Sequence, residues 1–152
     1  MNRLERLRKS IDAILWKQHD KDELRAGFIH LYSVSAVCAM LAEKRRLDSE
    51  TAATAGMLHD IWSYDTSNSA HHAELGAEEA EKMLRESGEY SDEEISAITT
   101  AIAHHSNKQD IDDDLSELLK DADVLQHHFY NPGYPVHETH KIRLNKLKRE
   151  LF

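Results

Sequence analysis

Residues 49–60 read Ser-Glu-Thr-Ala-Ala-Thr-Ala-Gly-Met-Leu-His-Asp, and this stretch decides the fold. Asp48 stands in front of it as a helix cap. The small residues between positions 52 and 56 indicate a helix that packs closely on both sides. An apolar pair then leads directly into His59 and Asp60. We therefore expect a tightly packed helix that ends in two polar side chains.

Apolar residues recur at helical spacing on both sides of this stretch. Ser91 and Glu94 form a capping box at the start of one helix, and Gly88 ends the helix before it. The sequence shows neither strand-like alternation nor an internal repeat. It predicts an all-α bundle of about six to seven helices, at residues 3–18, 21–46, 49–60, 71–87, 91–105, 114–129 and 138–151, with polar loops at 63–70 and 107–113.

The length of 152 residues fits a single domain, 1–152. Cys38 is the one cysteine, so no internal disulfide can form, and a reducing cytoplasm is the expected location. No apolar signal core follows the first nine residues, which argues against export. No stretch approaches the roughly 20 apolar residues of a membrane span.

The formal net charge is −9. This charge argues against a broad surface for polymeric nucleic acid or for an anionic membrane. A small phosphorylated molecule is compatible with it, because bound metal cations would reverse the local field. The basic helix at 138–151 can pack on the acidic body or on a partner, and we expect a solvated face. The sequence does not predict an oligomeric state.

Several of the 11 histidines lie on apolar helix faces. His30 shares the face of Val34 and Leu41, and His105 continues the isoleucine stripe of its helix in place of His104. In the same way His72 faces inward rather than His71, by a smaller margin. Near the end of the chain, Asp121 and Asp123 flank an apolar stripe on opposite sides, and the spacing does not separate them.

One inward-facing histidine is usually a core group that is hydrogen-bonded to a carbonyl. Five inward-facing polar groups on five helices need another explanation, because each unpaired buried group costs about 1–3 kcal/mol. A shared divalent transition metal provides one, since imidazole and carboxylate together suit Fe, Mn, Ni, Co or Zn. We therefore predict a site for one or two such ions.

The order of these residues resembles the H…HD…D pattern of the HD superfamily. His30 comes first, His59 and Asp60 follow after an apolar run, and Asp123 comes last. The resemblance covers about residues 24–128. It implies an all-α HD domain and a metal-dependent hydrolase.

Two further segments resemble a subset of this superfamily that binds two metals. Residues 72–77 are similar to its H-x-x-x-G-A segment, and residues 101–106 are similar to its second histidine segment. The subset includes small phosphohydrolases. The resemblance also favours Asp123 over Asp121, because the last ligand of the family usually follows a small residue. The ligands that it implies are His30, His59, Asp60, His72, His105 and Asp123.

The implied activity is hydrolysis of a small nucleotide or phosphorylated metabolite by a metal-activated water. Asp60 would bridge two metals, and His59 would be essential beside it. The nearest cations in sequence, Lys108 and Lys120, are expected at the solvated surface. Two alternatives stay open, namely a di-iron oxygenase of the HD type and a non-catalytic module that senses a metal or a nucleotide.

Overall fold

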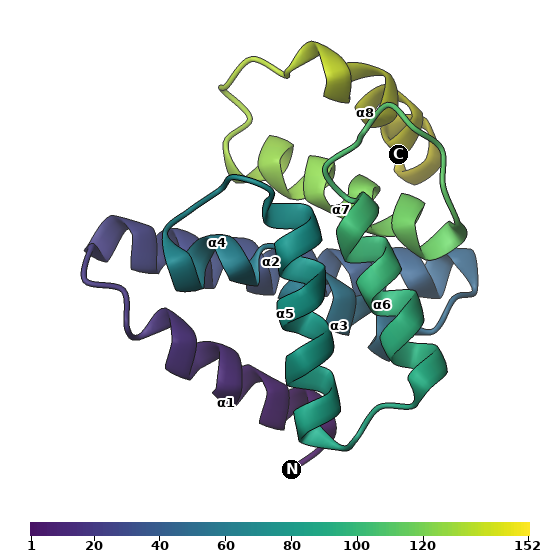
Figure 1. Cartoon of the computed structure of the whole chain (residues 1–152). Helices are drawn as coiled ribbons and strands as arrows, with labels where there is room; N and C mark the ends of the chain where they lie inside the picture. Colours follow the sequence, from purple (N-terminus) through teal and green to yellow (C-terminus); the bar gives the residue numbers. More distant parts are fainter.

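The computed structural model describes residues 1–152 as helices joined by short loops, with no strand (Figure 1). The all-α fold predicted from the sequence is confirmed. The helices are α1 (Arg3–Leu15), α2 (Lys21–Arg45), α3 (Ser49–Leu58), α4 (Ile61–Thr66), α5 (His72–Ser87), α6 (Asp92–His104), α7 (Asp114–Tyr130) and α8 (Glu138–Leu151).

The seven helices expected from periodicity all occur, with ends that differ by at most three residues. The short helix α4 is additional, because residues 63–70 were expected to form a loop. Its six residues are too few for a periodic pattern to reveal, since two turns present no full apolar stripe. The backbone breaks at Asp60 and becomes helical again at Ile61.

Local signals place the other helix ends. The Asp48 carboxylate accepts a hydrogen bond from the backbone N–H of Thr51 at 2.7 Å, and the predicted capping box of Ser91 and Glu94 is present. Gly88 ends α5 with a φ of 68°, a left-handed conformation that glycine adopts without strain.

Helix α3 lies at the centre, between α2, α6 and α7. Its residues from Ala52 to Leu58 are all buried. A Cβ atom at Gly56 would lie 2.9 Å from the Cα atom of Ser35 and 2.9 Å from the Sγ atom of Cys38, both on α2. The absence of a side chain at Gly56 therefore sets the distance between the two helices.

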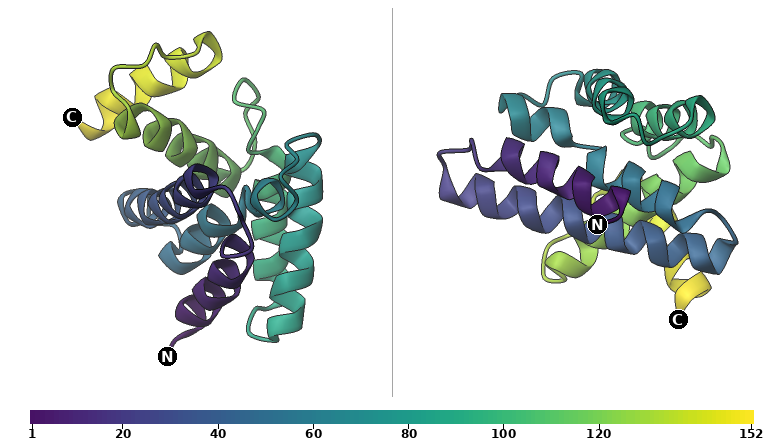
Figure 2. Two further views of the ribbon diagram at one scale, coloured as in Figure 1. Left: turned by 90° about the vertical axis from the view of Figure 1, so that its left-hand side faces the viewer. Right: turned by 90° about the horizontal axis from the view of Figure 1, so that it is seen from below.

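Two pairs of helices flank this centre (Figure 2). Helices α5 and α6 run side by side in opposite directions on one side, and α7 with α8 lies on the other. The C-terminal ends of α3 and α6 and the N-terminal end of α5 lie beside interior turns of α2 and α7 in the middle of the molecule.

Helix α8 packs on α7 through the buried Leu144 and Leu147. The expectation of a solvated basic face is wrong for Arg143, whose guanidinium lies 2.8 Å from both Glu117 and Asp121 of α7. Basic residues of α8 that are exposed are Lys141, Lys146, Lys148 and Arg149.

Helix α2 is long and apolar enough to cross a membrane by length and composition, with a mean hydropathy of 1.4 over an 18-residue window. The expectation that no stretch approaches a membrane span is therefore too strong. This is weak evidence for a span, because core helices pass the same test. Leu31, Val34 and Leu41 of this helix belong to the buried core.

Candidate metal centre

His59 and Asp60 lie in the break between α3 and α4. His59 is the last residue with helical backbone angles, and Asp60 follows with φ −116° and ψ 14°. His105 occupies the equivalent place at the end of α6, and His72 is the first residue of α5. The residue before it, His71, has a left-handed φ of 52° and turns the chain into α5.

Three of these histidines are held by the same local contact. In each, Nδ1 lies within hydrogen-bond distance of the backbone carbonyl three residues earlier. The pairs are His59 with Gly56 (2.7 Å), His105 with Ile102 (2.6 Å) and His72 with Ser69 (3.1 Å). A carbonyl oxygen can only accept, so each Nδ1 carries a proton, and Nε2 is the atom through which each ring binds a metal when it is neutral.

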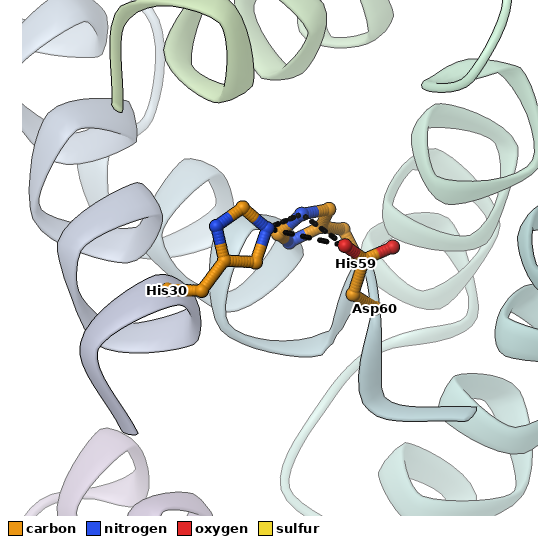
Figure 3. A group of neighbouring side chains, drawn as sticks. All are labelled: His30, His59 and Asp60. Atoms are coloured by element: carbon orange, nitrogen blue, oxygen red, sulfur yellow. Dashed lines mark hydrogen bonds and ion pairs between the residues drawn. The ribbon is translucent and has the colours of Figure 1, made fainter. Parts of the chain in front are cut away.

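His30 lies in the interior of α2, where the backbone carbonyls are used by the helix. Its Nδ1 donates instead to the side-chain oxygen of Gln126 on α7, 2.9 Å away. Its Nε2 atom lies 3.0 Å from the Nε2 atom of His59 (Figure 3). The hydrogen bonds at Nδ1 thus turn the Nε2 atoms of two imidazoles toward each other.

The carboxylate of Asp60 divides the centre into two halves. Its Oδ2 atom lies 3.1 Å from Nε2 of His30 and 3.3 Å from Nε2 of His59. Its Oδ1 atom lies 3.2 Å from Nε2 of His105 and 3.6 Å from Nε2 of His72. The side chain of Asp60 therefore contacts two groups of imidazoles, one through each oxygen.

The structure shows which of the two aspartates that helical spacing could not distinguish faces the cluster. The Oδ1 atom of Asp123 lies 3.6 Å from Nε2 of His30 and 3.7 Å from Nε2 of His59, and it is buried without a hydrogen-bond partner. Asp121 points away and pairs with Arg45 and Arg143. The six residues predicted as ligands thus lie together in one cluster.

Two expectations about lysines are wrong. Lys120 is fully buried and pairs with Asp112 and Glu117, and the Lys108 side chain is 6% exposed. The Nζ atom of Lys108 lies 2.5 Å from Oδ2 of Asp123. Lys108 is paired with one carboxylate, that of Asp123, and Lys120 is paired with two. Apart from Glu117 and Lys120, which lie three residues apart on one helix, sequence spacing gave no sign of these pairings.

His127 belongs to the same cluster but is not among the ligands predicted from the sequence. Its Nε2 atom lies 3.3 Å from Oδ1 of Asp123, and the side chain is 58% exposed at the edge of the centre. A usable signal existed, because residues four apart share a helix face and His127 follows Asp123 by four positions. The contact of Gln126 with His30 was also not predicted from the sequence.

The centre favours positive charge. Burial lowers the pKa of His59, but the carboxylates of Asp60 and Asp123 outweigh burial and raise this pKa to about 10. Burial raises the pKa of Asp60 and Asp123, yet His59 beside the first and Lys108 beside the second hold both well below their ordinary values. Both carboxylates are therefore charged at neutral pH.

A divalent transition metal fits these residues. Imidazole nitrogens and carboxylate oxygens are ligands of Zn, Fe, Mn, Co and Ni. The ligand atoms form overlapping groups within 4.8 Å of one another, including His30-His59-Asp60 and Asp60-His72-His105. The buried Oδ1 of Asp123 lacks a hydrogen-bond partner, and a cation beside it would meet that need.

With this geometry established, comparison with known proteins identifies the family. The HD domain family matches residues 27–127, and the chain belongs to it. The crystal structure of a predicted HD superfamily hydrolase from an uncultured Thermotogales bacterium is similar over 99% of this chain and 94% of its own, with a TM-score of 0.64 and 20% sequence identity. That similarity concerns the fold.

The chain is also similar to ribonuclease Y from two strains of Nitratidesulfovibrio vulgaris, DP4 and Hildenborough. The identity is 37% over 97 residues. These residues make up 63% of this chain but 17% of the ribonuclease, so the chain spans about a sixth of the length of these relatives.

Proposed function

We propose that this protein is a metal-dependent phosphohydrolase that acts on a small nucleotide or another phosphorylated metabolite. The observation that carries the proposal is the convergence of the imidazole Nε2 atoms of His30, His59, His72 and His105 on the carboxylate of Asp60. HD-family membership supports a hydrolase.

In this proposal, His30, His59 and Asp123 would hold one ion, His72 and His105 would hold a second, and Asp60 would contribute to both. A divalent ion supplies an acidified water molecule and neutralises phosphoryl oxygens. The carbonyl contacts at Nδ1 keep the rings oriented. His127, which is exposed at the edge of the centre, would contact an anionic substrate in this proposal.

A small substrate fits the charge of the protein better than a polymer does. The formal net charge of −9 repels long polyanions, whereas a single phosphate responds mainly to the local field at the centre. The similarity to ribonuclease Y gives a second candidate, which is cleavage of an RNA phosphodiester bond. A cytoplasmic location stays a prediction from the single cysteine.

The experiment is an activity screen of the untagged chain after loading with Mn²⁺, Fe²⁺, Co²⁺, Ni²⁺ or Zn²⁺. Substrates include nucleotides, dinucleoside polyphosphates, sugar phosphates and a short RNA. We expect release of phosphate or of a nucleotide from a small substrate, and no activity in Asp60→Ala. Asp121→Asn, which alters an aspartate outside the cluster, is expected to stay active.

Cleavage of the RNA alone would replace the small-molecule proposal with the ribonuclease candidate. If no phosphoester or phosphoanhydride is hydrolysed, the phosphohydrolase proposal is rejected. Oxygen consumption by a reduced di-iron form with an organic substrate would then support an oxygenase instead. Binding of metal or nucleotide without any turnover would support a sensing module.

A further inference from the structure

Lys108 is a buried cation in contact with the candidate metal centre. Its Nζ atom lies 2.5 Å from Oδ2 of Asp123 and 2.6 Å from the backbone oxygen of His105. The backbone oxygen of Lys108 in turn accepts a hydrogen bond from Nη2 of Arg143, 3.0 Å away. Both ends of this lysine are therefore fixed between α6, α7 and α8.

The two oxygens of Asp123 have different surroundings. Oδ2 is paired with the ammonium group of Lys108, whereas Oδ1 faces the Nε2 atoms of His127, His30 and His59. The lysine thus holds the carboxylate in one rotation and leaves a single oxygen for a metal. Without a metal, the ammonium group also compensates a carboxylate that would be costly to bury alone.

We propose that Lys108 is a built-in cation that shares Asp123 with the metal, and that it weakens metal binding while it stabilises the metal-free fold. This inference rests on the proposed metal centre. A divalent ion at Oδ1 and the ammonium group at Oδ2 would flank one carboxylate, and like charges this close repel strongly in a buried site. The lysine therefore makes metal loading reversible and leaves the loaded centre more positive.

Neutral substitutions separate this role from a merely structural one. Lys108→Met removes the charge and keeps the length, whereas Lys108→Gln removes the charge and keeps an N–H donor. Lys120→Met is the matched control, because Lys120 is also a buried lysine but pairs with Asp112 and Glu117 outside the cluster. Affinity for Zn²⁺ and Co²⁺ is measured by competition with a chelator, and unfolding is measured with and without metal.

In both Lys108 variants we expect metal affinity to rise by about tenfold or more, since the positive charge that competes with the metal for Asp123 has been removed. We also expect the melting temperature of the metal-free protein to fall. Lys120→Met is expected to lower the melting temperature with no comparable rise in affinity. If a Lys108 variant folds only when metal is present, that result also supports the proposal, because it shows that the lysine stabilises the metal-free fold.

Weaker or unchanged metal affinity in the Lys108 variants would overturn the inference, and so would failure to fold with metal present. These results would leave the phosphohydrolase proposal intact, because the wild-type chain would still bind metal. A wild-type chain that binds no metal would reject both. Metal affinity is thus read independently of turnover, so the two proposals can fail separately.

Discussion

The backbone oxygen of Gly56 lies 2.7 Å from Nδ1 of His59, and Gly56 is also a point at which α2 lies too close to α3 to leave room for a side chain. One residue therefore fixes both the orientation of a candidate ligand and the packing of the central helix.

Gly56→Ala is expected to destabilise the protein by about 1–3 kcal/mol, because the new Cβ atom would overlap backbone atoms of Ser35 that cannot move alone. Chemical denaturation measures the loss. Gly133→Ala is the control, since its Cβ atom would meet only Asn131 Oδ1 at 3.5 Å. Equal stability of the two variants would contradict the packing described here.

Asp123→Asn is expected to remove most of the bound metal, because the amide lacks the charge that faces His30 and His59. Asp121→Asn should retain metal, since Asp121 pairs with arginines outside the cluster. Metal analysis of both purified proteins tests the assignment. Retention of metal in the first variant and loss in the second would reverse it.

Gln126→Leu is expected to lower metal affinity about 10- to 100-fold, the usual effect of losing the partner that orients a ligating histidine. Gln126 accepts a hydrogen bond from Nδ1 of His30. The control is Gln109→Leu, because Gln109 is exposed and contacts no candidate ligand. Chelator competition gives both affinities. An unchanged value for Gln126→Leu would show that His30 needs no such partner.

His105→Ala is expected to reduce bound metal from two ions to one, since His105 lies on the Oδ1 side of Asp60. His104→Ala is the neighbouring control, because that side chain points to Asp112 and Ser116. The metal-to-protein ratio of each purified variant shows whether one ion has been lost. A single ion in the wild-type protein would argue against a two-metal centre.

Acid stability is expected to depend on Glu117. Burial raises the pKa of this carboxyl, but hydrogen bonds from Arg143 and Lys120 outweigh burial and lower the pKa from 4.5 to about 2. The folded state thus favours the ionised form, so Glu117 contributes stability above pH 4.5 that is lost as the pH falls toward 2.

Glu117→Gln should therefore lose stability at neutral pH and show a flatter decline between pH 4.5 and pH 2 than the wild-type protein. Melting temperatures across this range test the expectation, and the exposed Glu86→Gln provides the comparison. A wild-type decline that survives in Glu117→Gln would assign the acid sensitivity to other carboxyls.

Helical spacing predicted much of this structure because it reports which side of a helix is buried. It distinguished the buried His105 from the more exposed His104 and placed seven helices. It missed α4, which is too short for a stripe. It also could not assign Asp121 and Asp123, because their different partners lie on other helices.

The wrong expectation that Lys108 and Lys120 are solvated has the same cause. The buried ammonium groups of Lys108 and Lys120 pair with the carboxylates of Asp123 and Asp112, respectively, and these groups come together only after the chain has folded. Composition predicts a solvated lysine in most contexts. A single sequence does not reveal these pairings, which depend on tertiary contacts.

Three histidines of the centre are oriented by backbone carbonyls rather than by other side chains. Mutation cannot delete a carbonyl, so this part of the orientation persists whatever side chains surround the centre. Evolution can therefore change the residues at the entrance without losing the alignment of the rings. We therefore expect related chains to differ in substrate specificity more readily than in the orientation of their metal-binding histidines.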